Sequence, residues 1–128
     1  MKIGIAGTGK MGSAIALRLL GLKNEVHIWN RSAARTRPLV EQGAHAADSA
    51  ADLPDRCDAV LTILTDAAAI DAVYNGKDGL LSGKVAGKLF IEMSTVSAAT
   101  ERALAPAVAA KGAALVECPV GGSTAPAR

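Results

Sequence analysis

The stretch "KIGIAGTGKMG", residues 2–12, contains the pattern on which the interpretation of the whole chain depends. Residues 2–6 are mostly apolar and predict a buried strand, and a helical pattern begins at residue 10. Across this junction, Gly7, Gly9 and Gly12 stand at the spacing GxGxxG. In a strand–loop–helix unit of this kind, the first glycine permits a tight turn, the second lets a ligand approach the backbone, and the third lets the helix pack closely.

The start of the helix after these glycines is a predicted phosphate site. Amides in the first turn of a helix have no intrahelical partner and lie at the positive end of the helix dipole. We therefore expect the backbone at Thr8, Lys10 and Met11 to bind phosphate groups. A turn without a ligand is the alternative interpretation. A Walker-type phosphate loop is excluded, because no GK[ST] sequence closes the motif.

Short apolar runs alternate with helical patterns along the rest of the chain. Strands are predicted at residues 2–6, 25–29, 59–64, 88–93 and 114–118, with a weaker one at 44–47. Helices are predicted at residues 10–22, 32–43, 66–76 and 97–112, and Pro38 and Pro106 predict kinks in two of them. Strands separated by helices pair in parallel, with right-handed crossovers that place helices on both faces. The pattern predicts an α/β, Rossmann-type doubly wound parallel sheet of about six strands in the order 3-2-1-4-5-6.

The residues that follow the second strand indicate which ligand this sheet would bind. Ligands of doubly wound sheets lie beyond the carboxyl ends of the strands, and an acidic residue after the second strand usually binds the ribose hydroxyls of NAD. Here Asn30, Arg31 and Ser32 occupy that place. Asn30 removes the repulsion of a 2′-phosphate, and Arg31 adds a guanidinium suited to it. The segment therefore predicts NADP (NADPH) as the cofactor, with Arg35 and Arg37 either adding charge or facing solvent.

Composition and charge exclude several other classes of protein. The 128 residues fit one domain, and 14 basic against 12 acidic residues give a charge of +2, too even for a general nucleic-acid or membrane binder. Cys57 and Cys118 belong to no CxxC or Cys/His pattern, so no metal site is expected. No apolar run approaches the length of a membrane span, and the first residues do not form a signal peptide. We expect a cytoplasmic protein.

Several linked motifs together resemble one known family over nearly the whole chain. They are "GIAGTGKMG" (4–12), "WNRS" (29–32), "LTILTD" (61–66), "IEMSTVS" (91–97) and "ECPVGG" (117–122). The chain is similar in these motifs to the β-hydroxyacid dehydrogenases, which include 3-hydroxyisobutyrate dehydrogenases and tartronate semialdehyde and glyoxylate reductases, and more distantly 6-phosphogluconate dehydrogenase. The resemblance implies hydride transfer between the nicotinamide and a small hydroxy acid or its oxo form.

The resemblance also implies roles for residues near the ends of the later strands. The backbone near Leu64 and Thr65 would lie alongside the cofactor, and Thr95 would contact its nicotinamide side. Substrate contacts are implied for Ser94, Gly121, Gly122 and Ser123. In this chain a glycine stands at position 121 where the family usually has serine, and a serine stands at 123 in place of the final glycine. Two other interpretations remain: the hydroxyls of Ser94 and Thr95 serve the start of a helix, and the last ten residues form a tail.

The resemblance also implies a domain organisation in which the catalytic residue is not part of this chain. Residues 1–118 would form the NADP-binding domain and residues 119–128 the start of the substrate loop. The family's catalytic lysine, and the all-helical domain that closes the pocket and builds a homodimer, would lie beyond Arg128. Lys84, Lys88 and Lys111 do not stand in the corresponding motif, so no catalytic residue is expected in this chain. The alternatives are a non-catalytic NADP-binding or sensing module and, among enzymes, an imine reductase-like protein.

Overall fold

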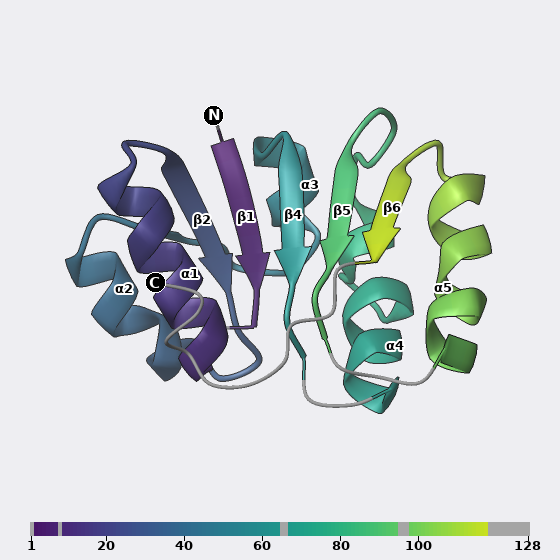
Figure 1. The fold of residues 1–128 in the computed structure, drawn as a ribbon, viewed down its shortest axis with the longest axis horizontal. Helices are drawn as coiled ribbons and strands as arrows, with labels where there is room; N and C mark the ends of the chain where they lie inside the picture. The colour runs from purple at the N-terminus through teal and green to yellow at the C-terminus, as the bar shows by residue number, and fades with distance from the viewer. Residues whose placement is uncertain (1, 8, 65–66, 95–97, 118–128) are drawn as a thin grey trace.

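A six-stranded parallel sheet forms the centre of the molecule. The computed structural model describes residues 2–7, 9–64, 67–94 and 98–117. The strands are β1 (Lys2–Ala6), β2 (Glu25–Trp29), β3 (His45–Ala46), β4 (Ala59–Thr62), β5 (Leu89–Glu92) and β6 (Ala114–Glu117). They pair in parallel in the order β3-β2-β1-β4-β5-β6, and the strand arrows labelled in Figure 1 all point the same way. The predicted fold class and strand order are confirmed.

The helices follow the predicted places but are shorter and more divided. They are α1 (Lys10–Gly21), the 3-10 turn η1 (Ala33–Thr36), α2 (Arg37–Glu41), α3 (Asp52–Arg56), α4 (Ala67–Asn75), the 3-10 turn η2 (Leu80–Ser82) and α5 (Ala98–Ala110). The single helix expected at residues 32–43 is instead η1 followed by α2, with Pro38 in the first turn of α2. Proline is tolerated there because the first amides of a helix need no intrahelical partner. Pro106, in contrast, lies inside α5.

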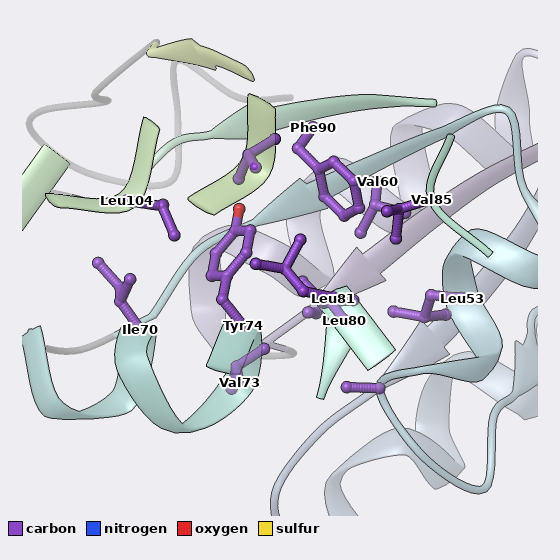
Figure 2. Close-up of a cluster of buried hydrophobic side chains, with 13 residues drawn as sticks. Leu53, Val60, Ile70, Val73, Tyr74, Leu80, Leu81, Val85, Phe90 and Leu104 are labelled. Carbon is purple, nitrogen blue, oxygen red and sulfur yellow. The ribbon is translucent and has the colours of Figure 1, made fainter. Parts of the chain in front are cut away.

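Helices cover both faces of the sheet, as the alternation of side chains along β1 requires. Ile5 belongs to a buried cluster with residues of α1 and α2, whereas Ala6 belongs to a larger cluster with residues of α3, α4 and α5. Figure 1 shows α3 passing behind the sheet. Figure 2 shows the larger cluster, in which the ring of Tyr74 lies between Leu104 and Leu81. The core is therefore built in two layers, mostly from aliphatic side chains.

Helix α3 is an element that the sequence pattern did not predict. It has five residues, too few for a helical period to be recognised, and it contains Pro54. Its Leu53 is fully buried, and a Cβ at Gly4 of β1 would lie 3.2 Å from the Leu53 Cβ and 3.3 Å from the Cys57 Sγ. The glycine therefore lets α3 pack directly on β1, one of the two central strands of the sheet.

Candidate functional site

A cleft of about 570 Å³ opens where the loops after β1, β2 and β4 meet. This is the point at which the strand order reverses, because β1 pairs with β2 on one side and with β4 on the other. Its lining residues share small or apolar character except at the exit of β2. They are Gly7, Gly9, Trp29, Asn30, Arg31, Arg35, Ile63, Leu64, Ala68, Ala69, Ala72 and Val73.

Gly7 makes the turn out of β1, and no other residue fits there. Its φ of +102° lies in the left-handed region, and a Cβ would lie 2.1 Å from the carbonyl oxygen of Ile63. Its amide donates a hydrogen bond to the carbonyl of Trp29 at 2.9 Å, which ties the glycine loop to the end of β2. The role predicted for the first glycine, a tight turn, agrees with this geometry.

Gly12 and Gly9 differ in what surrounds them. A Cβ at Gly12, in the first turn of α1, would lie 2.0 Å from the carbonyl oxygen of Gly7, so this glycine allows the helix to approach the loop. Around Gly9 nothing lies within 4 Å of an added Cβ, and the residue lines the cleft. Gly9 is also the N-cap of α1 and provides no side-chain hydrogen bond to the first turn. The backbone at Gly9 therefore faces open space at the positive end of a helix, where an anionic group fits.

Two arginines give the cleft a positive charge. Arg31 and Arg35 are exposed and are the charged residues among those described that line the cleft. They reach the same wall because η1 begins between them: the Arg35 amide donates to the carbonyl of Ser32 at 3.1 Å. The Asn30 side chain donates to the same carbonyl at 3.0 Å and so stabilises this turn. Arg37 is exposed but does not line the cleft.

Ser94 supports the part of the cleft wall that directly follows β4. The Leu64 amide donates to the Ser94 hydroxyl at 2.6 Å, and the Ser94 side chain is only 1% exposed. The Ser94 amide donates in turn to Oε1 of the buried Glu92 at 2.7 Å. In this structure the Ser94 hydroxyl supports the wall of the cleft by accepting from an amide after β4, which differs from the alternative interpretation that it serves the start of the following helix. Its role as a substrate contact stays a prediction.

Sequence reasoning missed several lining residues. Trp29, the last residue of β2, and Ile63 line the cleft, and so do Ala68, Ala69, Ala72 and Val73 of α4. A usable signal was present in the alanine-rich sequence after the fourth strand, because small side chains at the start of that helix leave room for a ligand. No local signal distinguished Arg35 from Arg37.

The remaining predicted residues fall into two groups. Lys10 and Met11 lie in the first turn of α1 and Ser32 precedes η1, next to the cleft but not among its lining residues. The other predicted contacts lie outside the described residues, so they stay predictions. These are Thr8, Thr65, Thr95, Gly121, Gly122 and Ser123.

The lysines that were not assigned a catalytic role lie at the other edge of the sheet. Lys88 directly precedes β5 and Lys111 comes shortly before β6, so both stand at the amino ends of parallel strands. With Lys84 and Asp55 they line a separate hollow of about 510 Å³. They are therefore remote from the carboxyl-edge cleft.

The described residues contain no other arrangement with evident chemistry. Burial raises the pKa of the Cys57 thiol to about 12, so this thiol is protonated and unreactive at neutral pH. Within the described ranges, no three His, Cys, Asp or Glu side chains are grouped so that they could hold a metal ion. No helix in the described part of the chain is long and apolar enough to cross a membrane.

Comparison with known proteins agrees with the family resemblance of the sequence motifs. The profile of the family described as the NAD binding domain of 6-phosphogluconate dehydrogenase matches residues 2–128. Glyoxylate/succinic semialdehyde reductase 1 of Arabidopsis thaliana is 38% identical over 127 residues, which are 99% of this chain and 44% of that protein. A 3-hydroxyisobutyrate dehydrogenase of Pseudomonas aeruginosa is 39% identical over 127 residues, 98% of this chain and 42% of that protein. The chain thus spans less than half the length of these relatives.

Other similar proteins carry different names. The human cytokine-like nuclear factor N-PAC is 34% identical over 122 residues, 95% of this chain and 22% of that protein. Among solved structures, Psf3 in complex with NADP+ and 2-OPP has a TM-score of 0.89 and 33% identity, and the match covers 95% of this chain and 43% of that one. An imine reductase from Pseudomonas sp. has a TM-score of 0.85 and 25% identity, with 96% and 42% covered.

Proposed function

This chain belongs to the family of NAD binding domains of 6-phosphogluconate dehydrogenase, and on that basis we propose that it is the NADP-binding domain of a β-hydroxyacid dehydrogenase or related carbonyl reductase. The family agrees with the resemblance read from the motifs, and binding of a nicotinamide dinucleotide follows from it. NADP as the preferred cofactor, the substrate and the activity of the whole protein are parts of the proposal.

The observation that carries the choice of NADP is the charge of the adenosine end of the cleft. Arg31 and Arg35 line it together, and the residue after β2 is Asn30 instead of a carboxylate. A 2′-phosphate would meet two guanidinium groups there and no described acidic side chain. The similarity to Psf3, whose structure contains NADP+, supports the same choice.

The fit of the cofactor to the glycine loop supports the proposal independently. Gly9 leaves space at the start of α1, where a pyrophosphate would accept hydrogen bonds from backbone amides at Lys10 and Met11. Bound NADPH would supply a hydride to the carbon of a small oxo compound. This chain's residues would bind and orient the cofactor, with Thr65 and Thr95 on the nicotinamide side and with Gly121, Gly122 and Ser123 beside the substrate. The resemblance implies that a lysine of the family would supply the proton, and no described lysine of this chain lines the cleft.

The test is a titration with NADPH and NADH, followed by the fluorescence of Trp29, the single tryptophan of the chain and a lining residue of the cleft. We expect Arg31→Ala to weaken NADPH binding roughly ten- to hundredfold, because a charge-assisted contact contributes about 1.5–3 kcal/mol. NADH binding should stay unchanged. Arg37→Ala is the matched control, since Arg37 is also exposed but does not line the cleft. Equal affinity of the unsubstituted chain for the two cofactors would refute the choice of NADP.

A second candidate function is a cofactor-binding module without catalysis. Similarity to the nuclear factor N-PAC favours it, because that protein's name does not describe an oxidoreductase. Turnover separates the two functions: the product of the complete reading frame and this chain are each mixed with NADPH and a panel of small aldehydes, 2-oxo acids and cyclic imines. NADPH consumption by the complete product supports the reductase, and the substrate consumed separates a carbonyl reductase from an imine reductase. Binding without consumption supports the module.

A further inference from the structure

A buried carboxylate lies directly behind the cleft wall, and the proposed function does not use it. Glu92 is the last residue of β5, fully buried, and stands beside Thr62 in the register of β4 and β5. The Thr62 hydroxyl donates a hydrogen bond to Glu92 Oε2, and the Tyr74 hydroxyl of α4 lies 2.7 Å from the same Thr62 oxygen. Because the Thr62 hydroxyl has one proton and gives it to Glu92, Tyr74 donates to Thr62.

The second oxygen of this carboxylate continues the chain of hydrogen bonds to the cleft. Glu92 Oε1 accepts from the Ser94 amide at 2.7 Å, and the Ser94 hydroxyl accepts from the Leu64 amide at 2.6 Å. Leu64 lines the cleft. The network therefore connects Tyr74 of α4 to Leu64 in the wall of the cleft. It also links the carboxyl ends of the neighbouring strands β4 and β5.

Stability alone does not account for a carboxylate at this position. Among the described residues, no Lys, Arg or His lies within ion-pair distance of Glu92, and its neighbours Tyr74 and Phe90 belong to the apolar cluster of Figure 2. Burying a carboxylate without a cation is unfavourable unless hydrogen bonds compensate, and apolar side chains often replace buried polar networks without loss of stability. A fully bonded network does fix the orientation of its members. Here the oriented members are the backbones of Leu64 and Ser94.

The order of the strands indicates which half of the cofactor these backbones would contact. The arginines stand after β2, the glycine loop after β1, and the Glu92 network after β4 and β5, in that order along the edge of the sheet. A dinucleotide with its 2′-phosphate at Arg31 and its pyrophosphate at Gly9 must extend its other half toward β4 and β5. We propose that Glu92 is a positioning residue for the nicotinamide half of the cofactor, acting through Ser94 and Leu64; the proposal rests on the proposed function.

The test compares two ligands that differ only in the nicotinamide: NADPH and 2′-phospho-ADP-ribose. We expect Glu92→Leu to weaken NADPH binding roughly tenfold, which corresponds to the loss of one or two hydrogen bonds. The affinity for 2′-phospho-ADP-ribose should change by no more than about twofold. Glu92→Gln should restore NADPH binding, because a glutamine can accept from the Ser94 amide and donate to Thr62. A residue needed only for stability would change both affinities alike.

Ser94→Ala keeps the proposal testable if Glu92→Leu does not fold. It removes one hydroxyl and should weaken NADPH selectively, whereas its control Ser82→Ala, which loses a 2.7 Å bond to the Gly79 carbonyl away from the cleft, should not. Equal weakening of both ligands by Glu92→Leu or Ser94→Ala, or no weakening, would overturn the positioning role. Failure of the unsubstituted chain to bind either ligand would instead overturn the proposed function.

Discussion

At the residue scale, the three glycines of the loop have the same side chain but different constraints. Gly7 is required by its left-handed backbone and by the Ile63 carbonyl, and Gly12 by the Gly7 carbonyl. Gly9 has a φ of −70° and open space around it, so the folded chain itself does not require a glycine there. Under the proposed function, its constraint would come from the phosphate groups of the cofactor in the cleft. This distinction separates the two glycines that build the turn from the one proposed to serve the ligand.

Substitution of Gly7 and Gly9 by alanine should therefore give opposite results. We expect Gly7→Ala to lower the free energy of unfolding by at least about 2 kcal/mol, because strain and a 2.1 Å contact with backbone combine. Gly9→Ala should change it by less than about 0.5 kcal/mol but weaken NADPH binding, since its methyl group would enter the cleft. Urea unfolding and the Trp29 titration measure the two effects. NADPH binding that Gly9→Ala leaves intact would contradict the phosphate site.

At the element scale, the two prolines show how position within a helix decides their effect. Pro38 lies in the first turn of α2, where the missing amide removes no hydrogen bond. Pro106 lies in the middle of the 13-residue α5, where its ring and missing amide disturb the bond to the carbonyl four residues earlier. Both side chains are exposed. Nothing in the structure explains why a proline stands at position 106.

These two positions provide a matched pair of substitutions. We expect Pro106→Ala to raise the free energy of unfolding by about 1–3 kcal/mol, because alanine restores a helical hydrogen bond and loses no buried contact. Pro38→Ala should change it by less than about 0.5 kcal/mol. The urea midpoint at an unchanged m-value is the measurement. If Pro106→Ala changed the free energy of unfolding as little as Pro38→Ala, α5 would already accommodate its proline without loss of stability.

At the scale of the whole molecule, the sheet order brings three chain segments to one edge. The glycine loop, the arginine turn and the exit of β4 are separated in sequence, yet all line one cleft because their strands are neighbours in the sheet. The unfolded chain does not bring these segments together. A cofactor that binds across them therefore binds the folded state alone and stabilises it by mass action.

Thermal unfolding should accordingly report cofactor binding. At NADPH concentrations of about 100 times Kd we expect a stabilisation of about 2.7 kcal/mol, which raises the Tm of a chain of this size by about 10 °C. The same concentration of NADH should raise it much less, and Arg31→Ala should lose most of the NADPH effect. Calorimetric scans of the three samples provide the comparison. A Tm that does not respond to millimolar NADPH would contradict cofactor binding by this domain.

The sequence by itself determined the class of fold, the strand order and the glycine loop. These features depend on local properties: the spacing of apolar residues along Lys2–Ala6 and α1, and the backbone freedom of Gly7. The position of Arg31 at the exit of β2 followed from the same pattern. Such features are readable because each concerns residues close together in the chain.

Tertiary structure alone decided which distant residues meet. Whether Arg35 or Arg37 lines the cleft depends on the turn η1, and whether Trp29 does depends on its packing beside the glycine loop. Glu92 meets Thr62 only because β4 and β5 pair in one register, and Ser94 reaches the Leu64 amide for the same reason. Contacts between residues that are 30 positions apart depend on how two strands pair and how the helices pack on the sheet, and the spacing of residues within one segment does not identify such partners.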